Sequence, residues 1–373
     1  MGRVYVAEQQ GLDRVVAIKV LNVLAEDDPR GAPDTQERWR ERFFREAKLC
    51  SRLTHPNTVR IYDYGKTADD VYFIAMEYLE GRTLTALLRE EGPLDPLRAV
   101  TLVMQVCASL AEAHGAGLVH RDLKPDNLIV TRHAEGREFV KVLDFGIVKD
   151  LHSAAELPTE AGVVYGSPGY MSPEQILEQP LTPRSDIYSL GAILYKMVTA
   201  SGLFGSANPV AALTRHVTTQ PLSFAAANPS VQVPATLEWV TLQCVAKRPE
   251  DRFASMVEFG RALRVCELEL RGIAADSGPL RLDHGRLVVP TAIEEQLRRF
   301  EGDRTPAPNA SRIDRSHDPN EPRSQPTRPT SSMTGPALLV LGGLVPLVFG
   351  VTLLLLVVLV GGWWVLDPPP APV

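Results

Sequence analysis

The strongest constraint on this chain is a set of polar residues near its centre. The run His-Arg-Asp-Leu-Lys-Pro-Asp-Asn occupies residues 120–127, and Asp-Phe-Gly follows at residues 144–146. Within these runs, Asp122 can orient a hydroxyl nucleophile, while Asp144 and the amide of Asn127 can hold magnesium on the phosphates of a nucleotide. Two carboxylates and a carboxamide at this spacing predict phosphoryl-transfer chemistry.

Composition indicates a cytosolic compartment for the cysteines and argues against nucleic-acid binding. The chain has 373 residues, enough for one large domain or two ordinary ones, and 45% of them are hydrophobic, so a sizeable core can form. Its net charge of -6 argues against a nucleic-acid binder, which would carry a basic excess. The cysteines are far apart and form no C-x-x-C pair, which predicts reduced, buried thiols in a cytosolic compartment. They are Cys50, Cys107, Cys244 and Cys266.

The chain also divides into regions by composition. Residues 1–267 are mixed and periodic, as in a globular domain, and residues 1–20 alternate polar and apolar rather than forming a signal peptide. Residues 298–336 are rich in Arg, Asp, Ser and Pro and cannot bury enough apolar surface to offset their ordering entropy, so we expect a disordered linker. Between them, residues 268–297 form an extension with an ambiguous pattern, in which Thr291–Phe300 is compatible with a short helix.

A long apolar segment near the end of the chain predicts a single membrane span. Residues 337–366 are almost wholly apolar, and no charged side chain occurs anywhere in residues 329–366. A helix that crosses a bilayer needs about twenty apolar residues, and a buried core helix would rarely run this long without a polar face. Trp363 and Trp364 lie at the far end of the segment, where indole rings favour the membrane interface.

Arginine residues flank this segment on one side only. Arg323 and Arg328 precede it, whereas residues 367–373 carry no Lys or Arg. The asymmetry predicts that the span lies in the cell (inner) membrane and that the N-terminal domain stays in the cytoplasm. The seven residues after the span would form a short external tail, too short to fold as a sensor domain.

The N-terminal region predicts two strands and places a lysine in an unusual position. Residues 4–9 and 15–21 have strand patterns and are joined by a turn at Gly11. The second strand contains Val-Ala-Ile-Lys at residues 16–19. A lysine at the end of an apolar strand needs a reason: taken alone, Lys19 is read as a solvated residue at the end of a strand, and only the surrounding motifs favour a functional role.

The order of these motifs resembles that of eukaryotic-like protein kinases, and with its apolar C-terminal segment the chain looks like a bacterial transmembrane serine/threonine protein kinase. The resemblance covers residues 1 to about 267 and implies an α+β fold with two lobes. The N-lobe, about residues 1–79, would be β-rich with one helix, and the C-lobe, about residues 80–267, would be mostly helical. ATP would bind between the lobes, and the substrates would be Ser and Thr hydroxyls of proteins.

The resemblance also implies catalytic roles. Asp122 would accept the proton of the substrate hydroxyl late in the transfer, and its larger role would be to position that hydroxyl. Lys124 would neutralise charge on the γ-phosphate, and a lysine at this place is typical of kinases that act on Ser or Thr. Lys19 would bind the α- and β-phosphates and pair with Glu46 of a helix.

The metal and adenine contacts are implied in the same way. Asn127 and Asp144 would bind Mg²⁺, for which Mn²⁺ can substitute. A hinge between the lobes would hydrogen-bond adenine through its backbone, a gatekeeper would lie behind the ring, and three apolar side chains would sandwich it. The gatekeeper is Met76, the hinge residues are Glu77 and Leu79, and the sandwiching residues are Val4, Ala17 and Ile129.

The phosphate-covering loop departs from the family pattern. Kinases place a loop written G-x-G-x-x-G-x-V between two strands, and here only Gly2-Arg3-Val4 corresponds to it, with Gly2 as the phosphate-binding glycine. One hypothesis is that Met1 is an internal methionine of this loop that has been taken as the start. The alternative is a true truncation, which would remove backbone donors to the β-phosphate and leave the strand from Arg3 as an open edge.

Residues 147–170 resemble an activation segment. Arg121 directly precedes the expected catalytic aspartate, which suggests control by phosphorylation. A phosphate on this segment could pair with that guanidinium and order the loop. Thr159 is the preferred phosphorylation site, and Ser153 is the second.

Other residues of the C-lobe have structural roles in this family. Asp186 is expected to brace the backbone of the catalytic loop, and Glu174 is expected to pair with Arg252. His120 and Phe145 are expected to stack in an apolar spine.

Three functional hypotheses follow from the sequence. An active, membrane-anchored kinase is favoured, because the five polar groups that it needs are present. The incomplete glycine loop leaves a pseudokinase or scaffold with impaired ATP binding as an alternative. The third hypothesis is a membrane protein whose span dimerises and whose soluble domain merely transmits. Because the span has no G-x-x-x-G, close pairing of its helices is not predicted, and a homodimer is left open. The five polar groups are Lys19, Glu46, Asp122, Asn127 and Asp144.

Overall fold

The computed structural model describes residues 3–21, 33–69, 71–132, 136–145, 168–205, 208–274 and 280–302. Several expectations fall outside these ranges, namely those on Gly2, Ser153, Thr159, the linker beyond residue 302 and the apolar segment 337–366. Within the described ranges, no helix is both long and apolar enough to cross a membrane.

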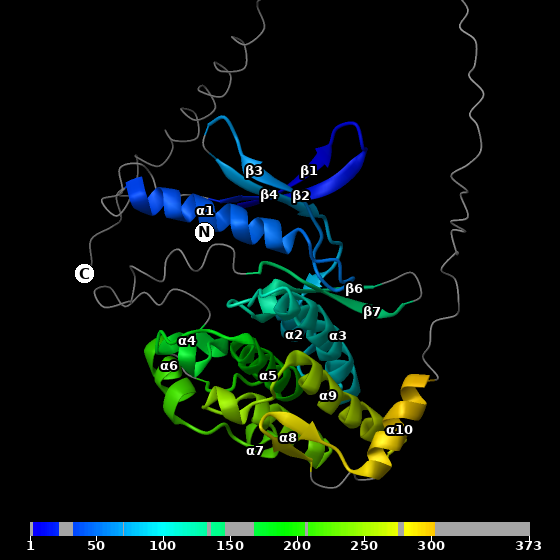
Figure 1. The fold of residues 1–373 in the computed structure, drawn as a ribbon. Helices are drawn as coiled ribbons and strands as arrows, with labels where there is room; N and C mark the ends of the chain where they lie inside the picture. The colour runs from blue at the N-terminus through cyan, green and yellow to red at the C-terminus, as the bar shows by residue number, and fades with distance from the viewer. Residues whose placement is uncertain are drawn as a thin grey trace, which may run out of the picture. The chain divides into compact units, whose positions relative to one another are not determined.

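An antiparallel four-stranded sheet forms the small lobe (Figure 1). Its order is β1-β2-β4-β3, with β1 at Arg3–Gln9, β2 at Arg14–Leu21, β3 at Ile61–Lys66 and β4 at Tyr72–Glu77. The two strands expected at residues 4–9 and 15–21 are therefore confirmed, and each begins one residue earlier.

Helix α1, Pro33–Cys50, accompanies this sheet. Phe43, Ala47 and Cys50 are buried, and their spacing places them on one side of the helix. The ring of Phe43 meets that of Tyr72 of β4 edge-to-face, with centroids 5.2 Å apart, which fixes the helix on the sheet. Glu46 is buried on the same side, so the packing of α1 carries a carboxylate into the interior.

The large lobe is mostly helical, and its helices begin where the sequence places start signals. Asp95, Ser172, Thr182 and Asn208 cap helices whose first residue is proline, and each side-chain oxygen accepts a backbone N–H. The elements are β5 (Arg82–Thr83), α2 (Leu84–Glu91), α3 (Pro96–Gly115), η1 (Pro125–Asn127), β6 (Leu128–Arg132), β7 (Glu138–Val142), α4 (Pro173–Ile176), α5 (Pro183–Thr199), α6 (Pro209–Thr218), α7 (Phe224–Ala227), α8 (Ala235–Cys244) and α9 (Met256–Leu270).

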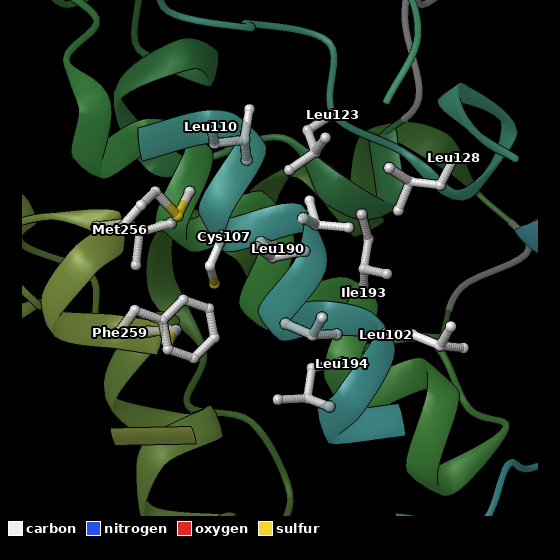
Figure 2. Close-up of a cluster of buried hydrophobic side chains, with 14 of the residues drawn as sticks. Leu102, Cys107, Leu110, Leu123, Leu128, Leu190, Ile193, Leu194, Met256 and Phe259 are labelled. Carbon is white, nitrogen blue, oxygen red and sulfur yellow. The ribbon is translucent and has the colours of Figure 1, made fainter. Parts of the chain in front are cut away.

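Helices α3, α5 and α9 enclose the main core (Figure 2). Helix α5 is buried around nearly its whole circumference, and a Cβ on its Gly191 would collide with Cys244 of α8, so these two helices touch closely. Residues 120–127 form the turn that carries the expected catalytic aspartate and are called the catalytic turn. Leu123 within this turn and Leu128 directly after it insert their side chains into the core. The catalytic turn is therefore anchored to the core.

The chain continues beyond the helical lobe as a hairpin and a helix. Strands β8 (Arg281–Asp283) and β9 (Arg286–Val288) pair antiparallel, and α10 spans Thr291–Gly302, which confirms the short helix expected at Thr291–Phe300. The boundary expected at residue 267 falls inside α9, and the linker expected from residue 298 begins inside α10, so both expectations need correction.

The physical reason for the second correction is amphipathicity. Ile293 and Leu297 are buried one turn apart, while Glu295, Arg298 and Arg299 are exposed. The polar residues 298–299 belong to the solvent-facing side of a helix, and composition alone does not distinguish that from disorder.

A buried ion pair joins α4 to the loop before α9, as expected. Both terminal nitrogens of Arg252 donate to the carboxylate of Glu174, at 2.7 and 2.9 Å. Arg252 is fully buried and donates further bonds to backbone carbonyls, including that of Arg184 at 2.9 Å. Burial alone would raise the pKa of Glu174, but the hydrogen bonds and charge of Arg252 outweigh burial and lower it.

We predict that Arg252→Ala lowers the free energy of unfolding by about 3–5 kcal/mol, because it leaves the Glu174 carboxylate buried without its cation. The matched control is Arg248→Ala, since the Arg248 side chain is 70% exposed and pairs with Glu250 and Asp251 at the surface. Thermal unfolding monitored by circular dichroism would separate the two variants. Equal melting temperatures for both would contradict the prediction.

Candidate active site

The catalytic turn is held by one carboxylate at the start of α5. Asp186 is almost fully buried and accepts the backbone N–H of His120 at 2.8 Å and of Arg121 at 3.0 Å. The ring of His114, in the last turn of α3, lies 2.7 Å from the same carboxylate. The expected bracing role of Asp186 is thus confirmed, and the part played by His114 was not anticipated.

Arg121 occupies a backbone conformation that non-glycine residues avoid. Its φ is +64°, in the left-handed region, which costs about 1–3 kcal/mol unless the surroundings impose it. The bond from its N–H to Asp186 supplies part of that constraint, and its carbonyl accepts from the side-chain amide of Gln175 at 2.7 Å. Gln175 was missed by the sequence reasoning, and its only signal was adjacency to Glu174.

The turn brings Asp122, Lys124 and Asn127 together. The ammonium of Lys124 lies 2.9 Å from the Asp122 carboxylate, and the Asn127 amide donates to the Asp122 carbonyl at 2.8 Å. Because the nitrogen of the Asn127 amide is engaged in this way, its carbonyl oxygen is the atom suited to coordinate a cation. The turn therefore combines a carboxylate, a mobile cation and an oxygen ligand within one short segment.

Asp144 is joined to this turn through the residue before it. The N–H of Leu143 donates to the Asn127 carbonyl at 2.8 Å, and the Leu143 carbonyl lies 2.8 Å from the ring Nε2 of His120. Burial lowers the pKa of His120, so the ring is neutral and can donate this bond from Nε2. The same ring stacks at a tilt on Phe145, 5.0 Å between centroids, as expected.

Lys19 reaches the site from β2, but its partner differs from the expected one. Its ammonium lies 2.8 Å from the Asp144 carboxylate, while a guanidinium nitrogen of Arg121 lies 3.5 Å from the carboxylate of Glu46. The expected Lys19–Glu46 pair is not the arrangement formed here. Two cations and two carboxylates share this region, and either way of pairing them compensates every charge.

One face of the small sheet carries the residues expected around the adenine ring. In the β1–β2 register Val4 lies opposite Lys19, and in the β2–β4 register Ala17 lies opposite Met76. Directly opposed residues point to the same face, so these four side chains share it. On this face Val4 is 62% exposed, although it is apolar, whereas Met76 is buried.

The other expected adenine contacts lie at the junction of the lobes. Ile129 is half-buried on β6, and Leu79 follows the end of β4. The side chain of Glu77 pairs with Lys141 of β7 at 2.6 Å, so only the backbone of Glu77 is suited to a nucleotide.

The oxygen and cationic groups fit a nucleotide with its metal. No cluster of three His, Cys, Asp or Glu side chains that could hold a metal by itself occurs among the described residues. One carboxylate (Asp144) and one amide oxygen (Asn127) match a Mg²⁺ site that is completed by phosphates and water. Lys19 and Lys124 supply the positive charge that a triphosphate needs.

Comparison with known proteins agrees with this geometry. The family model described as protein kinase domain matches residues 1–259. The chain belongs to the protein kinase family. The two-lobed α+β fold expected from the motifs is the fold of this kinase, and the family as a whole uses ATP with Mg²⁺ or Mn²⁺.

The chain is similar to several curated bacterial kinases. Serine/threonine-protein kinase pkn3 of Myxococcus xanthus is 42% identical, over 78% of this chain and 51% of its own length. PrkC of Bacillus subtilis is 38% identical, over 68% of this chain and 36% of its own, and PknB of Mycobacterium tuberculosis is 34% identical, over 69% and 40%. The names of these relatives are those of serine/threonine kinases, and this kinase spans between about a third and a half of their length.

A solved structure shares the fold. The crystal structure of the Mycobacterium tuberculosis PknI kinase domain is 27% identical and superposes with a TM-score of 0.53. The superposition covers 71% of this kinase and 90% of that chain. The lobes described above are therefore the kinase lobes.

We predict that Asp144→Asn lowers the affinity for Mg-ATP by at least the roughly tenfold that loss of an outer-shell partner costs a metal site. The neutral amide loses both the anionic ligand and the ion pair with Lys19. Asp126→Asn is the control, because Asp126 lies on the same turn but is exposed. Calorimetric titration with ATP, with and without Mg²⁺, would measure the affinity of each variant. If the affinity of Asp144→Asn depended on Mg²⁺ as that of the wild type does, Asp144 would not be a Mg²⁺ ligand.

Proposed function

We propose that this kinase is a catalytically active enzyme, anchored in the cell membrane with its kinase domain in the cytoplasm. It transfers the γ-phosphate of ATP to Ser and Thr hydroxyls of proteins and is activated by autophosphorylation. The observation that carries the proposal is the joint arrangement of Asp122, Lys124 and Asn127 on one turn, tied to Asp144 and Lys19.

In this proposal Asp122 receives the substrate hydroxyl. Its carboxylate orients the attacking oxygen and accepts the proton late, because the loose transition state of phosphoryl transfer needs little basicity. Lys124, already 2.9 Å from Asp122, stabilises the charge of the transferring group. A pseudokinase is disfavoured because each of these groups is present and correctly connected.

The nucleotide lies on the opposite side of the site. Asn127 and Asp144 would hold Mg²⁺, which would neutralise phosphate charge when bound. Lys19 then contacts the α- and β-phosphates and pairs with Glu46. The exposed apolar face of the small sheet covers the adenine ring. Its contacts are Val4, Ala17, Met76, Leu79, Ile129 and the backbone of Glu77, with Gly2 over the phosphates.

In this proposal, the phosphate on the activation segment binds to arginine side chains next to the catalytic turn. Arg121 and Arg45 line a cavity of about 130 Å³ between α1 and the catalytic turn, and Glu46 lines it too. A phosphate carries more negative charge than the Glu46 carboxylate and accepts bidentate bonds from arginine. Phosphate on Thr159, or secondarily on Ser153, would draw Arg121 away from Glu46 and leave Glu46 to Lys19.

Membrane attachment rests on the sequence of residues 337–366. Their length and apolarity match a bilayer, and the arginines that precede them predict the orientation. A homodimer is left open. Fractionation of cells that express the full chain, with and without residues 337–373, tests the attachment directly.

We predict that the full chain, incubated with Mg²⁺ and labelled ATP, phosphorylates itself, and that Asp122→Asn reduces the rate by roughly 10²- to 10⁴-fold, the range for loss of a positioned acid–base group. Nucleotide affinity should stay close to that of the wild type, because Asp122 faces the hydroxyl rather than the phosphates. Absence of both autophosphorylation and nucleotide binding in the wild type would instead support the scaffold.

We also predict that Thr159→Ala lowers the rate of substrate phosphorylation by roughly tenfold, since one to three charge-assisted hydrogen bonds to the phosphate are lost. Thr219→Ala, at the exposed end of α6, is the control. Mass spectrometry of the autophosphorylated protein locates the modified residue. Unchanged activity of Thr159→Ala would reject this site and direct the test to Ser153→Ala.

A further inference from the structure

The tip of the β8–β9 hairpin touches the loop before α9 through a glycine. The carbonyl of Gly285 accepts the N–H of Ala254 at 2.6 Å. A Cβ at Gly285 would lie 2.9 Å from both the Ala254 nitrogen and the Arg252 carbonyl oxygen, and 3.0 Å from the guanidinium of Arg184. Its φ is +79°, so both the backbone conformation and the close approach require glycine.

The rest of the extension is seated on the C-lobe. Leu280, Leu287, Ile293 and Leu297 are buried. The N–H of Leu287 donates to Glu258 of α9 at 2.8 Å, and Arg261 of α9 pairs with Glu294 of α10. Figure 1 shows the yellow hairpin and α10 alongside this helix. The family model ends at residue 259, so this segment lies beyond the part of the chain that defines a kinase.

A continuous series of contacts runs from this glycine to the catalytic aspartate. The loop that it touches carries Arg252, whose guanidinium holds Glu174 of α4. The next residue, Gln175, donates to the carbonyl of Arg121 at 2.7 Å, and Arg121 directly precedes Asp122. Helix α4 is therefore joined by one hydrogen bond to the residue that precedes Asp122.

We propose that the hairpin tip is a positioning element for the protein substrate, and that Gly285 is its critical residue. By holding residues 252–254, the tip keeps α4 in register with the catalytic turn. The inference rests on the proposed transfer to protein hydroxyls and adds that residues beyond the family domain help to set the affinity for the protein. The nucleotide groups Lys19 and Asp144 are outside this series of contacts.

The test compares two glycine variants of the full chain. Gly285→Ala introduces the collision, whereas Gly272→Ala has the same kind of positive φ, +66°, but nothing within 4 Å of its new methyl group. The strain of a left-handed alanine is common to both variants, so only the collision differs. Steady-state kinetics with myelin basic protein as the phosphate acceptor give separate KM values for the protein and for ATP.

We expect Gly285→Ala to raise the KM for the protein about tenfold, because small displacements of substrate-positioning groups have large effects. The KM for ATP should stay within about twofold, and Gly272→Ala should match the wild type in both constants. A purely structural role would lower the active fraction, and so kcat, with both KM values unchanged. A lowered kcat with both KM values unchanged would overturn the proposal. Equal KM values for the protein in Gly285→Ala and Gly272→Ala would also overturn it.

If Gly285→Ala does not fold, the α9–α10 pair provides the second route. Arg261→Glu places like charges together, and adding Glu294→Arg restores an opposite pair. The proposal expects the single variant to raise the KM for the protein and the double variant to bring it back. Equal KM values for the protein in wild type, single and double variants would overturn it. An inactive wild type would instead reject the proposed function itself.

Discussion

The active site of this kinase depends on a single buried carboxylate. Asp186 accepts two consecutive backbone N–H groups from the catalytic turn and contacts His114 from a third element. A carboxyl group in the interior is tolerated only when its oxygens are hydrogen-bonded, and here the donors belong to the backbone that has to be positioned. The bond to Asp186 stabilises the left-handed backbone conformation of Arg121, and that conformation orients Asp122.

The charged side chains around this turn form a group with two ways of pairing. Lys19 contacts Asp144 and Arg121 contacts Glu46, whereas the resemblance to kinases implied a Lys19–Glu46 pair. Neither pairing leaves one of these four groups without an opposite charge.

The C-lobe extends past the boundary that composition indicates. Residues 280–302 bury four apolar side chains and place a glycine against the loop that holds Arg252. Because Arg252 secures Glu174 and the neighbouring Gln175 reaches the catalytic turn, the extension is connected to the site by ordinary hydrogen bonds. This connection gives a physical basis for a contribution from outside the family domain.

The sequence by itself determined the residues of the catalytic turn, the first two strands of the small lobe and the short helix at Thr291–Phe300. Each rests on a short motif or a local periodicity, which neighbouring residues encode, whereas the Glu174–Arg252 pair, 78 residues apart, was expected from the resemblance to the family. Only the tertiary structure decided that Lys19 meets Asp144, that Gln175 and His114 support the turn, and that the polar residues 298–302 end a helix. Those outcomes depend on distances between segments remote in the chain and on which face of a helix finds an apolar surface, and no local pattern specifies either.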